Sequence, residues 1–124
     1  MTKYTPRVRE QDLHEAVVKF LRVALPREAV FLHVPNGEYR TKSGAARLQR
    51  MGVLPGAPDL LVFYLGIVVA PELKGTGGKL SPDQASVLIR LKSNGVHTGV
   101  CRSISDVFHL LRQAGIPLSA RMAA

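Results

Sequence analysis

The fold is decided by the sequence PDLLVFYLGIVVAPELK, which spans residues 58–74. Its two nearly continuous apolar runs predict strands at 60–64 and 67–73 that are covered on both faces of a sheet. Leu65-Gly66, between the two runs, predicts a tight turn in which the glycine supplies a positive φ. These residues therefore predict a buried β-hairpin.

The hairpin brings charged residues from its two ends together. It returns the chain so that Asp59, at the start of the first strand, lies beside Glu72, near the end of the second. Side chains two apart on a strand share a face, so Glu72 and Lys74 project together while Leu73 points into packing. We therefore expect Asp59, Glu72 and Lys74 to converge at one end of the sheet.

Two carboxylates and an amine in this arrangement suit metal-dependent hydrolysis of a phosphodiester bond. Neighbouring ionised carboxylates repel and raise each other's pKa unless a cation lies between them. Mg²⁺ binds through one or two carboxylates and keeps water and phosphate oxygens as further ligands. Lys74 could then orient a water molecule or neutralise the negative charge that develops on the phosphate.

Each of these residues also has a simpler interpretation. An aspartate at the start of a strand is often a turn residue, and a Glu-x-Lys pair is often a solvated ion pair worth about 0–1 kcal/mol. The apolar strands around these residues favour the catalytic interpretation, because perturbed charges at the ends of buried strands are typical of functional sites.

Four sequence blocks together resemble the VRR-NUC domain of the PD-(D/E)XK nuclease superfamily. They occur in the order HVPN at 33–36, PGAPDL at 55–60, ELK at 72–74 and SPDQ at 81–84, and the similarity extends from about residue 10 to residue 106. The resemblance implies a restriction-endonuclease-like α/β fold with an α-β-β-β-α-β core. It also implies a DNA nuclease that depends on Mg²⁺ or Mn²⁺.

The resemblance further implies roles for individual residues. Asp59 and Glu72 would be metal ligands, the backbone carbonyl of Leu73 a third ligand, and Lys74 the catalytic lysine. A glutamine at the position of Gln84 lies near the active centre in this family. A glutamate on the first helix often completes the metal cluster.

Two glutamates compete for that position on the first helix, which apolar residues at helical spacing predict at about 10–24. Glu10 continues the stripe of Leu13 and Val17 and so points toward the sheet, whereas Glu15 lies on the polar side. Glu10 is therefore the expected fourth metal ligand. The alternative is that Glu10 only stabilises the helix N-terminus through the dipole.

The segment between residues 36 and 52 is basic, and we interpret it as a loop that contacts DNA. Only Glu38 interrupts its positive charge, and the segment leads directly into the proposed site. An ordinary solvated connection is the alternative. The glycine-rich run 75–79 lacks the Walker A spacing but lets the backbone approach a phosphate. The expected nucleic-acid contacts are Asn36, Arg40, Lys42, Arg47, Arg50 and Lys79.

The other elements follow from caps and periodicity. Residues 81–84 predict a helix start with a capping box, so Gln84 could be a cap, a site residue or both. A strand-helix-strand crossing of this length predicts parallel pairing with a right-handed connection. The order α-β-β-β-α-β-α gives a mixed sheet flanked by helices, with an extra C-terminal helix. The expected bounds are a strand at 30–34, a helix from Pro82 to about Ser93, a strand at 96–101 and a helix near 105–114.

Length and charge fit this interpretation. The 124 residues include 17 Lys plus Arg against nine Asp plus Glu, a net charge of +8, and the pI is near 10.3. Such an excess favours a polyanionic partner such as DNA. One domain is expected over 1–117, with a disordered tail at 118–124. Without a signal-peptide pattern or an apolar segment of about 18 residues, a cytoplasmic protein is expected, with no membrane contact.

The expected function is a single-domain, metal-dependent DNA endonuclease. In the family, free-standing domains of this size resemble phage or bacterial proteins that act as homodimers on branched DNA such as four-way junctions, and the resemblance implies the same here. Two other classes remain compatible with the sequence: a non-catalytic nucleic-acid-binding module on a nuclease-derived fold, and an assembly or regulatory protein whose acids are ion-paired. The intact set of Asp59, Glu72 and Lys74 favours hydrolysis.

Overall fold

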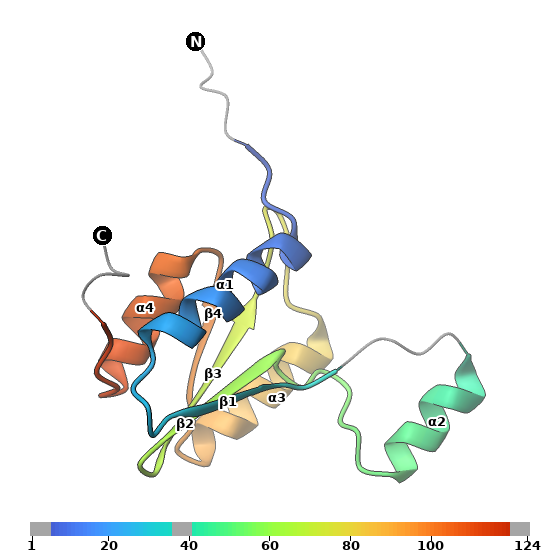
Figure 1. The fold of residues 1–124 in the computed structure, drawn as a ribbon. Helices are drawn as coiled ribbons and strands as arrows, with labels where there is room; N and C mark the ends of the chain where they lie inside the picture. The colour runs from blue at the N-terminus through green and yellow to red at the C-terminus, as the bar shows by residue number, and fades with distance from the viewer. Residues whose placement is uncertain (1–5, 36–40, 120–124) are drawn as a thin grey trace.

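The computed structural model describes residues 6–35 and 41–119, which form a mixed sheet between two layers of helices. The four strands are β1 (Val30–His33), β2 (Leu60–Tyr64), β3 (Ile67–Leu73) and β4 (His97–Cys101), in the order β1-β2-β3-β4. The helices are α1 (Glu10–Ala24), α2 (Lys42–Arg50), α3 (Pro82–Ser93) and α4 (Ile104–Gln113). Helices α1 and α4 lie on one face of the sheet and α3 on the other (Figure 1). The expected α/β fold is confirmed.

The hairpin of β2 and β3 has the predicted strands and turn. Val62 pairs with Val69 and Tyr64 with Ile67 in antiparallel register. The turn residues Leu65 and Gly66 both have positive φ, at 43° and 87°. Two positive φ values are characteristic of the type I′ turn, whose twist matches that of the strands. Gly66 behaves as expected, whereas the left-handed conformation of Leu65 was not predicted.

The crossover from β3 through α3 to β4 places β4 next to β3 in the sheet. β3 and β4 are parallel, with Glu72 opposite Val100 and Leu73 opposite Cys101. The Lys74 N–H donates to the Cys101 carbonyl at 3.0 Å and extends this pairing past the end of β3. The carboxyl ends of β3 and of the edge strand β4 therefore lie side by side, as the parallel pairing of a βαβ unit requires.

The core lies between the sheet and the pair α1 and α4. The buried residues of α1 are all apolar and occur at helical spacing: Leu13, Val17, Phe20, Leu21 and Ala24. Val107 and Leu111 are the buried residues of α4. Phe108 and Leu110 of the same helix are partly buried and pack against this core. Cys101 is buried, and burial raises the pKa of its thiol to about 12, so it is a small apolar core residue.

Residues 42–50 form a helix, so the expectation of a loop over this segment was wrong. Thr41 accepts a hydrogen bond from the Gly44 N–H at 3.0 Å and caps the helix N-terminus. The residues that follow include alanine, leucine, glutamine and arginine, which are good helix formers. α2 has no buried residue and stands away from the sheet (Figure 1). The helix therefore contributes no buried residue to the core.

Two residues of the expected C-terminal tail contact the domain. Leu118 is partly buried against the core cluster, and the Ser119 N–H donates to the Ala24 carbonyl at 3.0 Å. The remainder of the expected tail, 120–124, lies outside the described residues. None of the helices in the described ranges is long and apolar enough to cross a membrane.

Candidate active site

The ends of β2 and β3 bring Asp59, Glu72 and Lys74 to one edge of the sheet. The Asp59 carbonyl accepts a hydrogen bond from the Val34 N–H at 2.8 Å, which ties the residue to the end of β1. Glu72 is 1% exposed and Lys74 is 7% exposed. Both are therefore charged residues in the protein interior, where charge requires a partner.

The electrostatics of Glu72 show that these groups face one another. Burial, as the largest cause, and the negative charge of Asp59 raise the pKa of Glu72 from 4.5 to about 7. Lys74 opposes this shift, and Glu10 adds a smaller repulsion. The Glu72 carboxylate thus lies in a pocket that disfavours a second negative charge unless a cation is bound there.

Two oxygen atoms in this pocket have no hydrogen-bond partner among the described residues. They are Oδ2 of Asp59 and Oε2 of Glu72, and both atoms are buried. A buried carboxylate oxygen without a partner costs about 1–3 kcal/mol or more. Carboxylate oxygens are also the ligands that Mg²⁺ prefers, and one or two of them suffice. The donor set therefore fits a hard divalent cation.

Glu10 faces this site but contacts the lysine rather than joining a cluster of carboxylates. Its Oε1 lies 3.8 Å from Lys74 Nζ, and its side chain is half exposed. Within the ranges 6–35 and 41–119, no three His, Cys, Asp or Glu side chains are grouped so that they could hold a metal ion. Glu10, and not Glu15, is thus the α1 glutamate at the site, but its role as a metal ligand stays a prediction.

Gln84 both caps the helix α3 and contacts the candidate site. Its backbone N–H and side-chain Oε1 form the capping box with Ser81 at 3.1 and 2.9 Å. Its Nε2 donates to Glu72 Oε1 at 3.3 Å. One amide therefore joins the N-terminus of α3 to one oxygen of Glu72, and the other oxygen has no partner among the residues that the structure describes.

Gly56 allows the segment before Asp59 to lie against α3. Its φ is +83°, and a Cβ atom at this position would be 2.5 Å from the backbone carbon of Asp83. Only glycine combines this conformation with so close an approach. Sequence reasoning did not assign Gly56 a role, although it lies in the PGAPDL block.

His33 and His14 border the site on the side of β1. His33 Nδ1 lies 2.9 Å from the Asp59 carbonyl, and because a carbonyl only accepts, Nδ1 is the protonated nitrogen. The rings of His33 and His14 meet edge to face with centroids 4.7 Å apart. His33 therefore helps to fix the backbone of Asp59. His14 was not singled out from the sequence.

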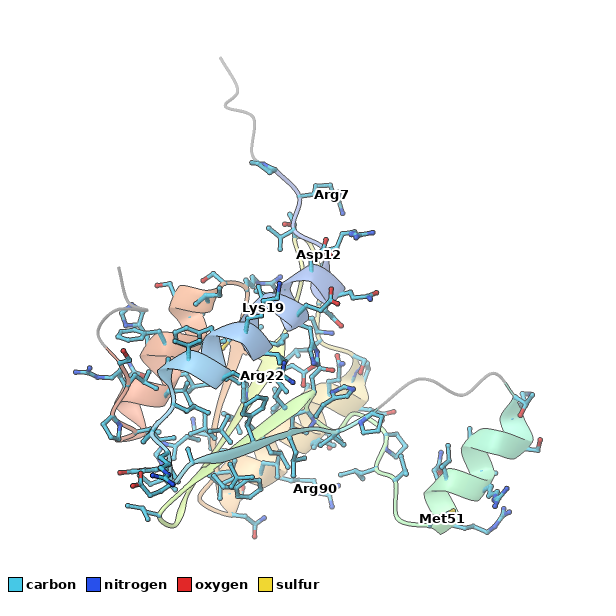
Figure 2. All side chains as sticks on the ribbon, viewed as in Figure 1. Arg7, Asp12, Lys19, Arg22, Met51 and Arg90 are labelled. Atoms are coloured by element: carbon cyan, nitrogen blue, oxygen red, sulfur yellow. The ribbon has the colours of Figure 1, made fainter. Side chains whose placement is uncertain are left out.

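The expected nucleic-acid contacts divide into two groups. Lys42, Arg47 and Arg50 lie on α2, where Met51 at the end of the helix is 70% exposed (Figure 2). Lys79 lies in a groove of about 400 Å³ next to the site, lined also by residues 76–78 and Arg102. Asn36 and Arg40 lie outside the described residues.

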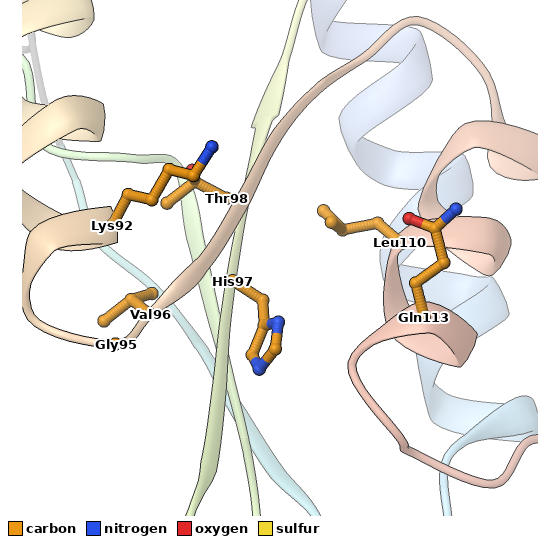
Figure 3. Close-up of a pocket in the computed structure, with 7 residues that line it drawn as sticks. All are labelled: Lys92, Gly95, Val96, His97, Thr98, Leu110 and Gln113. Carbon is orange, nitrogen blue, oxygen red and sulfur yellow. The ribbon is translucent and has the colours of Figure 1, made fainter.

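A second cavity is remote from these carboxylates. Its volume is about 340 Å³, and it lies at the beginning of β4, between the end of α3 and α4 (Figure 3). His97 in this cavity pairs with Val69, at the opposite end of the parallel ladder from Glu72. The lining residues are Lys92, Gly95, Val96, His97, Thr98, Leu110 and Gln113.

The comparisons with known proteins agree with this arrangement. The family profile of the VRR-NUC domain matches residues 9–105. The chain belongs to the VRR-NUC family. A solved structure described as a VRR_NUC domain protein is 21% identical and superposes with a TM-score of 0.70, covering 88% of this chain and 89% of its own. No curated protein matches the sequence at a significant level.

Family membership confirms the resemblance that the four sequence blocks suggested. The solved VRR-NUC structure independently supports the fold, because its coverage of both chains is nearly complete. Together they establish a nuclease-type fold for this protein. The residues of the ELK and PGAPDL blocks lie at the end of the sheet that holds the buried Asp59 Oδ2 and Glu72 Oε2.

Proposed function

We propose that this VRR-NUC protein is an endonuclease that hydrolyses phosphodiester bonds of DNA with a bound Mg²⁺ or Mn²⁺ ion. The observation that carries this proposal is a pair of buried carboxylate oxygens on Asp59 and Glu72, which have no hydrogen-bond partner in the described part of the chain and lie beside the buried Lys74. An ion-paired structural cluster would leave no such oxygens, because each would have a donor.

Asp59, Glu72 and the Leu73 carbonyl would hold the metal ion. When bound, a divalent ion supplies Lewis acidity and lowers the pKa of a coordinated water. Gln84 orients Glu72 by holding Oε1, so that Oε2 would be available to bind the ion. The His33 Nδ1–H and the Val34 N–H both donate to the Asp59 carbonyl and so hold the backbone of that residue.

Lys74 supplies the positive charge at the reacting phosphate. Its ammonium group is nearly buried, and Glu10 is its ion-pair partner at 3.8 Å. A buried cation stabilises negative charge on a phosphoryl group far more strongly than a solvated one, since water does not screen it. The same ammonium group can hold the attacking water through a hydrogen bond.

The basic surface supplies affinity for the substrate. The net charge is +8, and Lys42, Arg47 and Arg50 project on α2. Contacts of lysine and arginine with phosphates release counterions and so attract DNA irrespective of sequence. Lys79 would bind the backbone close to the scissile bond.

Branched DNA is the proposed substrate, and a homodimer the proposed active form. The family resemblance suggests both. Two active sites related by a two-fold axis would suit two scissile strands related by the same symmetry, as in a four-way junction.

The test is a panel of labelled four-way junction, flap, single-stranded and duplex DNA with Mg²⁺, Mn²⁺ or Ca²⁺. We expect cleavage of the junction with Mg²⁺ or Mn²⁺, and a reduction of about 10²- to 10⁴-fold in Lys74→Ala. Lys92→Ala, a lysine on the exposed side of α3, is the matched control and should cut at the parental rate.

The panel also separates this proposal from its alternatives. Tight DNA binding without cleavage in any metal would favour a non-catalytic module. Equal cleavage by Lys74→Ala and the parent would contradict the role of the lysine. Analytical ultracentrifugation of the protein with and without junction DNA tests the dimer.

A further inference from the structure

The turn that follows Lys74 is held from two sides. Residues 75–78 form a turn in which the Gly78 N–H donates to the Gly75 carbonyl at 3.0 Å. Gly75 lies against the entry to α1, where a Cβ atom would be 2.5 Å from the Val8 carbonyl oxygen. Val8 and Thr76 also exchange two hydrogen bonds of 2.8 Å. The segment that leads into α1 therefore fixes one side of the turn.

Arg102 fixes the other side. Its Nη1 donates to the Gly75 carbonyl at 3.0 Å, and its Nη2 donates to the Gly78 carbonyl at 2.8 Å. A planar guanidinium can span two acceptors in this way because its donors are arranged as a rigid fork. Arg102 thus closes the turn across both of its ends.

The backbone of Arg102 is itself anchored. The Arg102 N–H donates to Asp106 Oδ2 at 2.9 Å, at the capped N-terminus of α4. The preceding residue, Cys101, accepts the Lys74 N–H at 3.0 Å. The fork therefore projects from a rigid strand-helix junction that lies directly beside Lys74.

The turn lies beside the side chain of Lys74. A Cβ atom added to Gly78 would be 3.5 Å from Lys74 Cδ, so the glycine backbone lies next to the methylene stem of the lysine. Lys74 is only 7% exposed, although it lies just past the end of β3. With Glu10 near Nζ and Gly78 over the methylene stem, the ammonium group has little freedom to swing out.

We propose that Arg102 is a positioning residue that clamps the turn 75–78 over the stem of Lys74 and so holds the ammonium group at the candidate active site. The proposal rests on the proposed nuclease function. The Arg102 fork acts through hydrogen-bond geometry rather than through charge, because two of its donors are directed at backbone carbonyls.

The test compares Arg102→Lys and Arg102→Gln with the parent on the DNA that the parent cuts best. We expect both variants to lower the single-turnover rate at saturating DNA by about 10- to 100-fold. The dissociation constant for DNA should change by no more than about 3-fold in Arg102→Lys, which keeps the charge. Arg90→Gln, which changes an exposed arginine on α3, is the matched control (Figure 2).

A double substitution tests whether Arg102 acts through the lysine. In the Lys74→Ala background, Arg102→Gln should leave the residual rate unchanged, because groups that act as a unit are not additive. A full parental rate in Arg102→Lys would overturn the proposal, since charge alone would then suffice. An additive loss in the double variant, or a loss confined to DNA affinity, would also overturn it.

A measurement without DNA separates this proposal from the nuclease proposal. Acetylation of Lys74 by an amine-reactive ester, followed by mass spectrometry, should be about 3- to 10-fold faster in Arg102→Gln and Arg102→Lys than in the parent. The exposed Lys92 is the internal reference. Unchanged protection of Lys74 would overturn the clamp. Faster labelling in a protein that cuts no DNA would uphold the clamp and contradict the nuclease.

Discussion

The ends of β2 and β3 and the helix α2 are both rich in charge, but they keep that charge in opposite surroundings. Glu72 and Lys74 are 1% and 7% exposed, whereas α2 has no buried residue. A buried charge is costly unless it is paired or binds an ion, whereas a solvated charge acts mainly over long range. This difference underlies the two proposed roles, hydrolysis at the sheet end and attraction of DNA at α2.

Glu72→Gln should have the largest effect of any change that tests this comparison. It removes one buried carboxylate, and with it the capacity to hold a divalent ion, so we expect cleavage to fall by about 10²- to 10⁴-fold. Glu28→Gln, which neutralises an exposed glutamate between α1 and β1, should leave the rate unchanged. Single-turnover cleavage of junction DNA is the measurement. Comparable cleavage rates for Glu72→Gln and Glu28→Gln would show that the buried carboxylate matters no more for cleavage than the exposed one.

The pH dependence of stability should reveal the same buried carboxylate. The pKa of Glu72 is about 7 in the folded chain and near 4.5 in its ordinary state. Between these values the folded protein binds more protons than the unfolded chain, so the free energy of unfolding falls as pH rises from about 4.5 to 7. The expected loss is about 2–3 kcal/mol in metal-free protein.

Urea denaturation in EDTA at pH 5 and pH 8 measures this loss. Glu72→Gln should abolish most of it, since an amide does not titrate. Addition of Mg²⁺ at pH 8 should restore stability in the parent but not in Glu72→Gln, because a ligand that binds only the folded state stabilises it. A parent that is equally stable at both pH values would contradict the unfavourable environment assigned to Glu72.

Neutralising α2 should weaken DNA binding without affecting the chemistry. We expect Arg47→Gln with Arg50→Gln to reduce the slope of log K against log salt by about 2 and to leave the rate at saturating DNA unchanged. The thermal midpoint should also stay constant, because neither side chain is buried. Arg90→Gln with Lys92→Gln on α3 carries the same change in charge and is the control. A large drop in the saturated rate would place α2 in the active site.

The turn between β2 and β3 should give the smallest effect. Leu65 has a φ of 43° and is 74% exposed, so its side chain contributes little packing and holds a strained conformation. Asparagine adopts this conformation more readily, and Asn-Gly is a preferred type I′ sequence. Leu65→Asn should therefore stabilise the protein by about 0.5–1 kcal/mol in urea denaturation and leave cleavage unchanged. A destabilised Leu65→Asn would show that Leu65 has a packing role.

Local signals predicted most of the elements. The apolar runs of the hairpin, the capping box at 81–84 and the helical stripe of α1 each depend on residues close in sequence, so their bounds followed closely. The basic composition of residues 42–50 led to the prediction of a loop. The Thr41 cap and the helix-forming residues after it are local signals that favour the helix α2. The two-residue period of a strand also placed Glu72 and Lys74 on one face, because side chains two apart share a face.

The sequence by itself determined that Asp59, Glu72 and Lys74 meet at one end of a hairpin, because strand periodicity and a two-residue turn are local properties. Only the tertiary structure showed that Gln84 reaches Glu72, that Gly56 lies against α3, and that the Arg102 side chain spans Gly75 and Gly78. These contacts join residues 12 or more positions apart. Their formation depends on how whole elements pack, and no local pattern encodes that packing.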